Sequence, residues 1–268
     1  MILKRISILN YKNLEQVELD FSPKMNCFIG QNGMGKTNLL DAVYYLSFCK
    51  SSANPIDSQN IKHNQDFFVV QGSYLTDEGE PEEVYCGLKR RQKKQFKRNK
   101  KEYSKLSDHI GLIPLVMVSP ADSELILGGS EERRRFMDVV ISQYDKEYLG
   151  ALIRYNRALQ QRNVLLRGER EPDADMMSLM EDMMVAEAVC IHERRKQFTD
   201  ELIPIFTAFH NSIVGGGGST NFQKKIGKLA AFVAKKAFGF ITSGAGNIFT
   251  NIIEKHQKLR EAKKKIQK

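Results

Sequence analysis

The chain has 268 residues, a length that accommodates one large or two modest domains with a sizeable core. It contains no run of about 18 apolar residues, and its first residues lack the cleavage site of a signal peptide. We therefore expect a cytoplasmic protein whose body does not engage a membrane.

The formal net charge of +9 lies in the last part of the chain. Residues 221–268 carry eleven lysines and one arginine against two glutamates, whereas residues 1–220 hold 29 basic and 30 acidic side chains. The overall basicity therefore does not by itself predict that the body binds nucleic acid.

The chain begins with two segments that alternate apolar and polar residues, 2–14 and 17–21. This alternation predicts two antiparallel strands. The apolar run Met25–Ile29 follows and predicts a short buried strand, and residues 38–46 have apolar side chains at helical spacing.

Between the predicted strand and helix, residues 30–37 match the phosphate-loop pattern of Gly, four residues, Gly-Lys-[Ser/Thr] without a substitution. In such a loop, backbone N–H groups and the start of the helix bind phosphate, and glycines allow a close approach. Lys36 is expected to reach the β- and γ-phosphates of ATP, and the Thr37 hydroxyl to ligate Mg²⁺. The alternative is a glycine-rich turn without chemical meaning. The loop residues expected to hold nucleotide are Gly30, Gln31, Asn32, Gly33, Met34, Gly35, Lys36 and Thr37.

Residues 51–55 break the predicted helix, and residues 67–75 and 84–88 predict a pair of strands. The stretch 89–105 then contains ten basic residues and only Glu102 as an acid, which is compatible with a charged hairpin. The hairpin is either a solvated sheet edge or a contact to DNA phosphates. The candidate DNA contacts are Lys93, Lys94, Lys97 and Arg98.

The run Gly111–Pro120 predicts another buried strand, after which the pattern becomes helical. Ser130 is expected to cap a helix with acids in its first turn, and amphipathic helices are predicted over 144–168 and from Met176 to about Val214. A Gly-rich linker and a cationic segment follow from residue 215.

Four cysteines lie without the spacing of a CxxC motif or a metal site. Cys27 and Cys86 stand in apolar, strand-like surroundings, and free core thiols are expected. The four are Cys27, Cys49, Cys86 and Cys190.

Three motifs together resemble the RecF family of bacterial recombination-repair proteins. They are the strand end Leu9–Asn13, the loop with its continuation to Ala42, and Ser119-Pro120 ahead of Gly128 and the run Arg133–Asp138. The resemblance covers residues 1 to about 213. It implies an α/β fold with an ABC-type nucleotide-binding lobe, an inserted helical lobe and an incomplete C-terminal half. It also implies that Asn13 and Asn38 lie beside the nucleotide.

The resemblance predicts three parts: residues 1–125 of the nucleotide-binding lobe, a helical lobe over 126–214, and a linker and tail over 215–268 unlike the family. It implies ATP and Mg²⁺ as cofactors. The partners it implies are single-stranded and gapped double-stranded DNA, mediator proteins and a recombinase. It also implies an ATP-dependent homodimer. The expected role is replication and recombinational repair, through recombinase loading at gapped DNA.

Two motifs that complete an ATPase site in the family are not found in this chain: an apolar strand that ends in acidic residues, and a well-matched signature segment. No apolar strand that ends in paired acids follows residue 138, and the segment Thr242–Gly246 matches the expected signature weakly. Asp41, Asp122 and Asp138 do not end an apolar strand either, so no catalytic residue is assigned. We therefore expect ATP binding without turnover, and impaired dimerisation.

Two other classes of function compete with this one. A nucleotide or metabolite kinase would use the same loop, but it does not require the Arg133–Asp138 context or the basic hairpin. A non-catalytic module would bind nucleic acid or membrane through its cationic tail alone.

Overall fold

The computed structural model describes residues 1–168 and 173–214. The chain divides into two units, Met1–Val118 and Ser119–Lys268, and each is described by itself. The linker and tail predicted over 215–268, with the weak signature segment 242–246, lie outside the described residues. None of the described helices combines the length and apolar character needed to cross a membrane.

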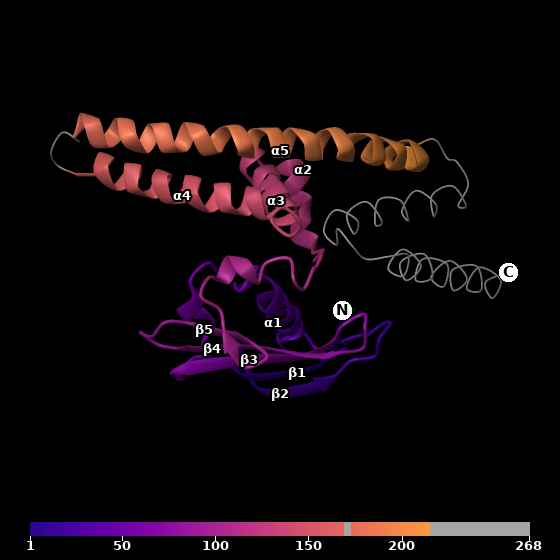
Figure 1. The fold of residues 1–268 in the computed structure, drawn as a ribbon. Coiled ribbons are helices and arrows are strands. Elements are labelled where there is room, and N and C mark those ends of the chain that lie inside the picture. The colour runs from indigo at the N-terminus through magenta and orange to yellow at the C-terminus, as the bar shows by residue number, and fades with distance from the viewer. Residues whose placement is uncertain (169–172, 215–268) are drawn as a thin grey trace. The chain divides into compact units, whose positions relative to one another are not determined.

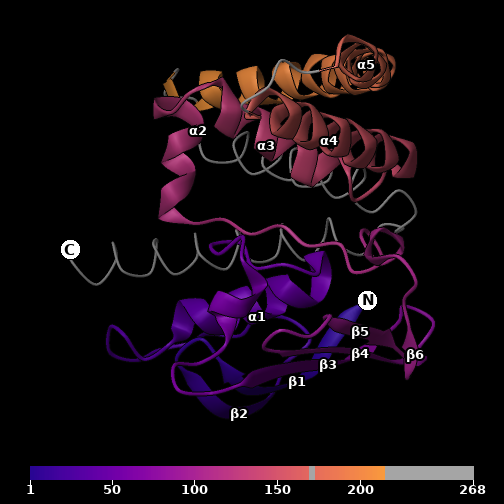
Figure 2. The same ribbon diagram turned by 90° about the vertical axis from the view of Figure 1, so that its left-hand side faces the viewer.

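The first unit is a six-stranded antiparallel sheet with helix α1 (Lys36–Phe48) over one face (Figures 1 and 2). The strand order is β2-β1-β3-β4-β5-β6, and neighbouring strands pair antiparallel. The strands are β1 (Ile2–Tyr11), β2 (Leu14–Asp20), β3 (Phe67–Leu75), β4 (Pro81–Lys89), β5 (Gln95–Arg98) and β6 (Lys101–Glu102). Short 3₁₀ turns occur at Asp57–Asn60 and Leu106–Asp108.

The core of this unit lies between α1 and the inner face of the sheet. Leu39, Ala42 and Leu46 recur at helical spacing along α1 and are buried. Alternate residues of each strand face them, because successive side chains of a strand point to opposite sides of the sheet. On the sheet side the buried residues include Ile6, Ile8, Phe68, Val70, Val84, Cys86, Leu88 and Phe96.

The strand pairs predicted at the N-terminus and over 67–88 are confirmed by this sheet. Ile8 pairs with Val17 between β1 and β2, and Val70 pairs with Cys86 between β3 and β4. The predicted charged hairpin also forms, as β5 pairs with β6.

Two other strand predictions are wrong. Residues 25–29 and 111–119 form no regular secondary structure, and Ile29 and Val118 are 95% and 83% exposed. A buried strand needs neighbours that satisfy its backbone N–H and C=O groups. Within the described part of the chain no strand pairs with either run. Cys27, expected in the core, is consequently exposed, whereas Cys49 and Cys86 are buried.

The second unit is helical. Its helices are α2 (Glu124–Leu127), α3 (Ser130–Ile141), α4 (Lys146–Leu166) and α5 (Ala174–Val214), preceded by a 3₁₀ turn at Pro120–Ser123. The α4 and α5 pair forms a long hairpin (Figure 1). The prediction that Ser130 caps α3 is wrong by one residue, since Gly129 holds the cap position. At α4 the Asp145 carboxylate accepts from the backbone N–H of Tyr148 at 2.9 Å, which is a side-chain cap.

One polar cluster joins the three longer helices of this unit. Arg195 of α5 donates to both carboxylate oxygens of Asp138 on α3, at 2.7 and 2.9 Å. Tyr148 of α4 accepts from Arg195 at 3.0 Å and donates to Asp138. The cluster sits at the edge of an apolar core that includes Ile141, Ile191 and Phe198.

We predict that Arg195→Ala destabilises the helical unit by about 1–2 kcal/mol, because it leaves Asp138 without its cation. The value is modest because the two side chains remain 22% and 21% exposed. Lys196→Ala, which removes an exposed pair with Asp200 on the same helix, is the matched control and should change little. Thermal unfolding followed by far-ultraviolet circular dichroism measures both, and equal losses would contradict the prediction.

Candidate functional site

The loop of residues 30–37 leads directly into α1 and has a backbone that requires glycine at two points. Gly33 and Gly35 have φ angles of 84° and 92°, in the left-handed region that other residues rarely adopt. Gly35 is a glycine of the motif itself, whereas Gly33 occupies one of the four positions that the motif leaves open.

The start of α1 is suited to an anion. Gly35 occupies the cap position without a side-chain hydrogen bond, and the first turn contains no acidic residue. The first N–H groups of any helix have no acceptor within it, and the helix dipole places partial positive charge there. Acids usually occupy such a first turn, so their absence from α1 leaves this end open to an external anion.

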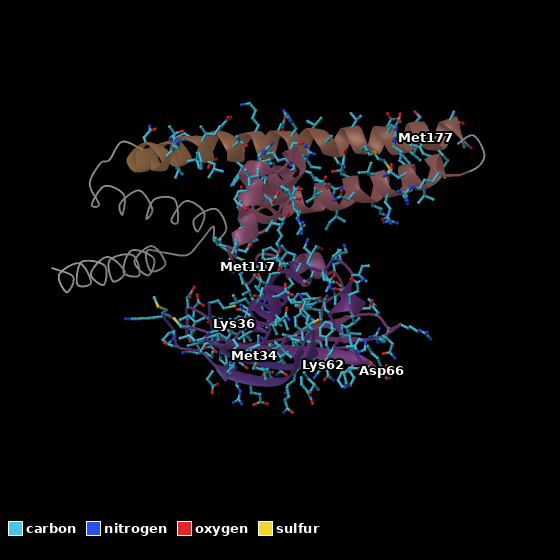
Figure 3. All side chains as sticks on the ribbon, turned by 180° about the vertical axis from the view of Figure 1, so that it is seen from behind. Met34, Lys36, Lys62, Asp66, Met117 and Met177 are labelled. Carbon is cyan, nitrogen blue, oxygen red and sulfur yellow. The ribbon has the colours of Figure 1, made fainter. Side chains whose placement is uncertain are left out.

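Lys36 is the first residue of α1 and lies near Met34 of the loop (Figure 3). Its ammonium group donates to the carbonyl oxygens of Gly30 and Gln31, both at 2.7 Å. Beside it is a hollow of about 210 Å³. The hollow is lined by Asn13, Asn32, Gly33, Gly35, Lys36, Thr37 and Asn38.

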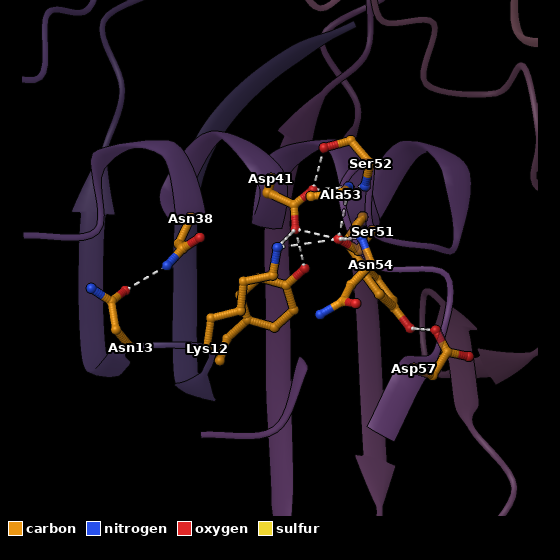
Figure 4. A network of polar contacts seen from close by, with 11 residues as sticks. Lys12, Asn13, Asn38, Asp41, Ser51, Ser52, Ala53, Asn54 and Asp57 are labelled. Carbon is orange, nitrogen blue, oxygen red and sulfur yellow. Dashed lines mark hydrogen bonds and ion pairs between the residues drawn. The ribbon is translucent and has the colours of Figure 1, made fainter. Parts of the chain in front are cut away.

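The turn between β1 and β2 fixes the loop from outside. Asn13 donates from Nδ2 to the Gly33 carbonyl at 2.7 Å and accepts at Oδ1 from Asn38 of α1 at 2.8 Å (Figure 4). A Cβ atom on Gly35 would lie 2.6 Å from the Leu14 side chain and 2.7 Å from Asn13 Oδ1. The structure thus brings Asn13 and Asn38, which the resemblance placed together, to the same loop.

Sequence reasoning gave no role to the Lys12–Asp41 pair next to this turn. The Lys12 ammonium is 2.6 Å from Oδ2 of Asp41, and the two side chains are only 14% and 3% exposed. Burial disfavours the charged carboxylate, but hydrogen bonds from Lys12, Ser52 and Tyr11 outweigh it and hold the pKa of Asp41 below its usual value. Burial, with Asp41 close by, raises the pKa of Tyr11, so its hydroxyl remains a donor.

A second hollow, of about 410 Å³, lies on another side of the loop and is mostly apolar. Phe28 and Ile29, from the run wrongly predicted as a strand, line it together with Leu14, Val17 and Met34. It shares Gly35 and Lys36 with the first hollow.

The basic hairpin places its four candidate DNA contacts in two different settings. Lys94 donates to Asp57 and to the Cys49 carbonyl, both at 2.6 Å, and it is 12% exposed. Arg98 binds both carboxylate oxygens of Glu82, which is buried. Both side chains thus have partners inside the unit.

The other two candidates face outward. Lys93 is exposed, and Lys97 is half-buried with its ammonium 5.6 Å from the centre of the Tyr85 ring. The structure does not bring any of the four to the phosphate-loop hollow.

Comparison with known proteins gives one family model and a set of relatives. Residues 1–117 match the model of an AAA ATPase domain. A DNA replication and repair protein RecF of Phocaeicola vulgatus is 74% identical over 213 residues, which are 80% of this chain and 57% of that protein. Proteins of the same name from Bacteroides fragilis and Parabacteroides distasonis are 71% and 59% identical, each with 80% of this chain and 58% of the relative covered. The chain thus spans less than three fifths of these relatives' length.

Solved structures show the same likeness in three dimensions. The recombination mediator protein RecF-ATPrS of the RecFOR pathway superposes with a TM-score of 0.74 at 25% identity, over 91% of this chain and 71% of that one. The RecF-ATP structure gives a TM-score of 0.70 at 22% identity, over 96% and 68%. The predicted fold class is therefore confirmed.

We predict that Gly35→Ala destabilises the first unit more than Gly79→Ala does. Both glycines have φ near 90°, and a side chain at either position costs about 1 kcal/mol of backbone strain. Nothing lies within 4 Å of a Cβ on Gly79, whereas a Cβ on Gly35 would meet Leu14 and Asn13. Overpacking should add about 1–3 kcal/mol at Gly35.

Urea unfolding of both variants measures this difference, with Gly79→Ala as the control for strain alone. If both variants lost the same free energy of unfolding, the Leu14 and Asn13 side chains would have moved aside for the new Cβ without an energetic penalty.

Proposed function

Since 213 residues of this chain are RecF-like in sequence and its fold is that of RecF structures, we propose that it is an ATP-binding protein of DNA replication and repair. The observation that carries the proposal is the loop itself. Two left-handed glycines, an acid-free helix start and Lys36 converge on one hollow. Phosphate oxygens would replace the carbonyls of Gly30 and Gln31 as partners of the Lys36 ammonium.

Residues in this hollow also fit a magnesium ion carried by the nucleotide. Thr37 is exposed and lines the hollow one residue after Lys36. Its hydroxyl would ligate Mg²⁺, and the remaining ligands would be phosphate oxygens and water, which this ion prefers. The backbone and side chains of Asn32 and Asn38 would supply further donors to the phosphates.

We propose binding without turnover for this chain. Among the described residues that line the hollow, none carries a carboxylate. Asp41 is on the same helix, but its oxygens are occupied by donors from Tyr11, Lys12, Ser51 and Ser52. Phosphoryl transfer to water requires an acid that helps to hold Mg²⁺ or to position the water.

The wider role is proposed from the relatives. They are named for DNA replication and repair and for recombination mediation. We propose contact with single-stranded or gapped DNA through the outward lysines of the basic hairpin, in a pathway that loads a recombinase. Mediator proteins are further partners that this role would require, and we propose that nucleotide-dependent pairing with a second copy is impaired in this chain.

The first test is Lys36→Ala, which should weaken ATP binding about a hundredfold, because it removes the charge that faces the phosphates. Lys24→Ala removes an exposed lysine shortly before the loop and should leave the affinity unchanged. Thr37→Val should abolish the gain in affinity that Mg²⁺ brings. Calorimetric titration of the full chain measures all three, and equal affinity of wild type and Lys36→Ala would refute the proposed site.

The second test separates the two settings within the basic hairpin. Replacing Lys93 and Lys97 by Gln should reduce the slope of log affinity against log salt by about 1.8 on duplex DNA, or about 0.9 per lost contact. Lys94→Met should leave that slope unchanged, because Asp57 already neutralises this lysine. Fluorescence anisotropy across a salt series measures both on the full chain, so the cationic tail contributes equally. An unchanged slope in the double variant would show that the hairpin is only a solvated edge.

A further inference from the structure

The Asp41 carboxylate accepts four hydrogen bonds and forms an ion pair with Lys12 (Figure 4). Oδ2 accepts from the Tyr11 hydroxyl at 2.6 Å and the Ser51 hydroxyl at 2.8 Å, and lies 2.6 Å from the Lys12 ammonium. Oδ1 accepts from the backbone and the hydroxyl of Ser52, at 2.7 and 2.6 Å. One buried charge on α1 thus ties down the end of β1 and the segment after α1.

The segment that Asp41 holds has a strained backbone. Asn10 and Lys12 both have left-handed φ angles, 55° and 50°, although neither is glycine. Such a conformation costs about 1 kcal/mol or more for each residue and persists only where the surroundings impose it. Hydrogen bonds from Lys12 N–H to the Asn60 carbonyl and from Lys62 N–H to the Asn10 carbonyl hold the backbone on one side. On the other side, the backbone is held by the Lys12 and Tyr11 side chains, which both contact Asp41.

The residue that follows this held segment is Asn13, which contacts the loop. Asn13 binds the Gly33 carbonyl and the Asn38 amide and packs where Gly35 has no side chain. Gly30 and Gly33 have nothing within 4 Å of an added Cβ, so packing restrains the loop little at these points. Asn13 therefore holds the Gly33 end of the loop, Lys36 holds the carbonyls of Gly30 and Gln31, and Asn13 directly follows Lys12 in the chain.

We propose that Lys12 and Asp41 are positioning residues for the phosphate loop, which set its affinity for nucleotide through Asn13 without contacting the nucleotide. This inference rests on the proposed function. The contacts form a chain: Asp41 binds the Lys12 ammonium, the left-handed backbone at Lys12 places the next residue, Asn13, beside the loop, and Asn13 binds the Gly33 carbonyl. Lys12 is engaged by Asp41 and Ser51 and is absent from the lining of the hollow.

A purely structural role for the pair is the competing explanation, and the chain offers a matched control. Lys94 is also a largely buried lysine that lies 2.6 Å from a carboxylate and braces α1, but it does so at the opposite end of the helix. Lys12→Met and Lys94→Met each remove one such brace. A general loss of stability would follow from both variants, whereas a change at the loop should follow only from Lys12→Met.

The experiment is a double-mutant cycle on the full chain, read as affinity for Mg-ATP in calorimetry well below the unfolding temperature. Lys12→Met should weaken binding about tenfold, and Asn13→Ala by at least as much. The double variant should bind no more weakly than Asn13→Ala alone, because Lys12 acts through Asn13. Lys94→Met should stay within about twofold of wild type.

Two outcomes of the affinity measurements overturn the inference. Losses that multiply in the double variant would show that Lys12 acts on the nucleotide independently of Asn13. Equal effects of Lys12→Met and Lys94→Met would show that only stability is involved.

A measurement made without nucleotide tests this inference separately from the proposed ATP binding. Hydrogen exchange of the peptide that covers residues 30–39 should accelerate in Lys12→Met and Asn13→Ala, but not in Lys94→Met. If wild type does not bind Mg-ATP, the proposed function fails, and the exchange result still decides whether the pair positions the loop. Unchanged exchange in Lys12→Met would overturn the inference whatever the affinities are.

Discussion

The packing of α1 against the antiparallel sheet is the constraint on which the rest of the first unit depends. Tyr11 of β1, Tyr45 of α1 and Phe68 of β3 are fully buried and meet edge to face, with ring centres 5.2 to 5.8 Å apart. Such contacts add about 0.5–1.5 kcal/mol each beyond the area they bury. The two tyrosine hydroxyls donate to Asp41 and Asp57, so the aromatic cluster also orients the polar groups around it. These contacts fix the orientation of α1, which begins at the phosphate loop, relative to the sheet.

Two largely buried lysines then fix α1 near its two ends. Lys12 binds Asp41 in the second turn, and Lys94 binds the Cys49 carbonyl just beyond the last turn, where the helix dipole favours a cation. A buried charge is tolerated only with partners, and each lysine has a carboxylate and further polar groups within reach. These contacts hold α1 in place at both ends, where the sequence pattern gave its bounds but not the side chains that anchor it.

Local patterns predicted the parts of the fold that local interactions determine. The alternation in β1 to β4 and the helical spacing in α4 and α5 appear in the structure at nearly the expected residues. Residues 25–29 and 111–119 are equally apolar, but a buried strand exists only where another segment pairs with it, and no short window contains that partner. The motif of residues 30–37 predicted the left-handed turn at Gly35, where the pattern requires glycine, but it leaves the second turn, at Gly33, open to any residue. The Lys12–Asp41 pair has no such signal, since the two residues meet only once β1 lies beside α1.

The basic hairpin shows that part of the missing information was present in the sequence. Side chains alternate across a strand, so residues two apart share a face. Phe96 is the apolar residue of this stretch and is buried, which assigns Lys94 and Arg98 to the inner face and Lys97 to the outer one. Inward cations must find carboxylates, and Asp57 and Glu82 meet them. In a charged strand, therefore, the buried apolar residue shows which charged side chains point inward, and only those on the opposite face are candidates for an interaction surface.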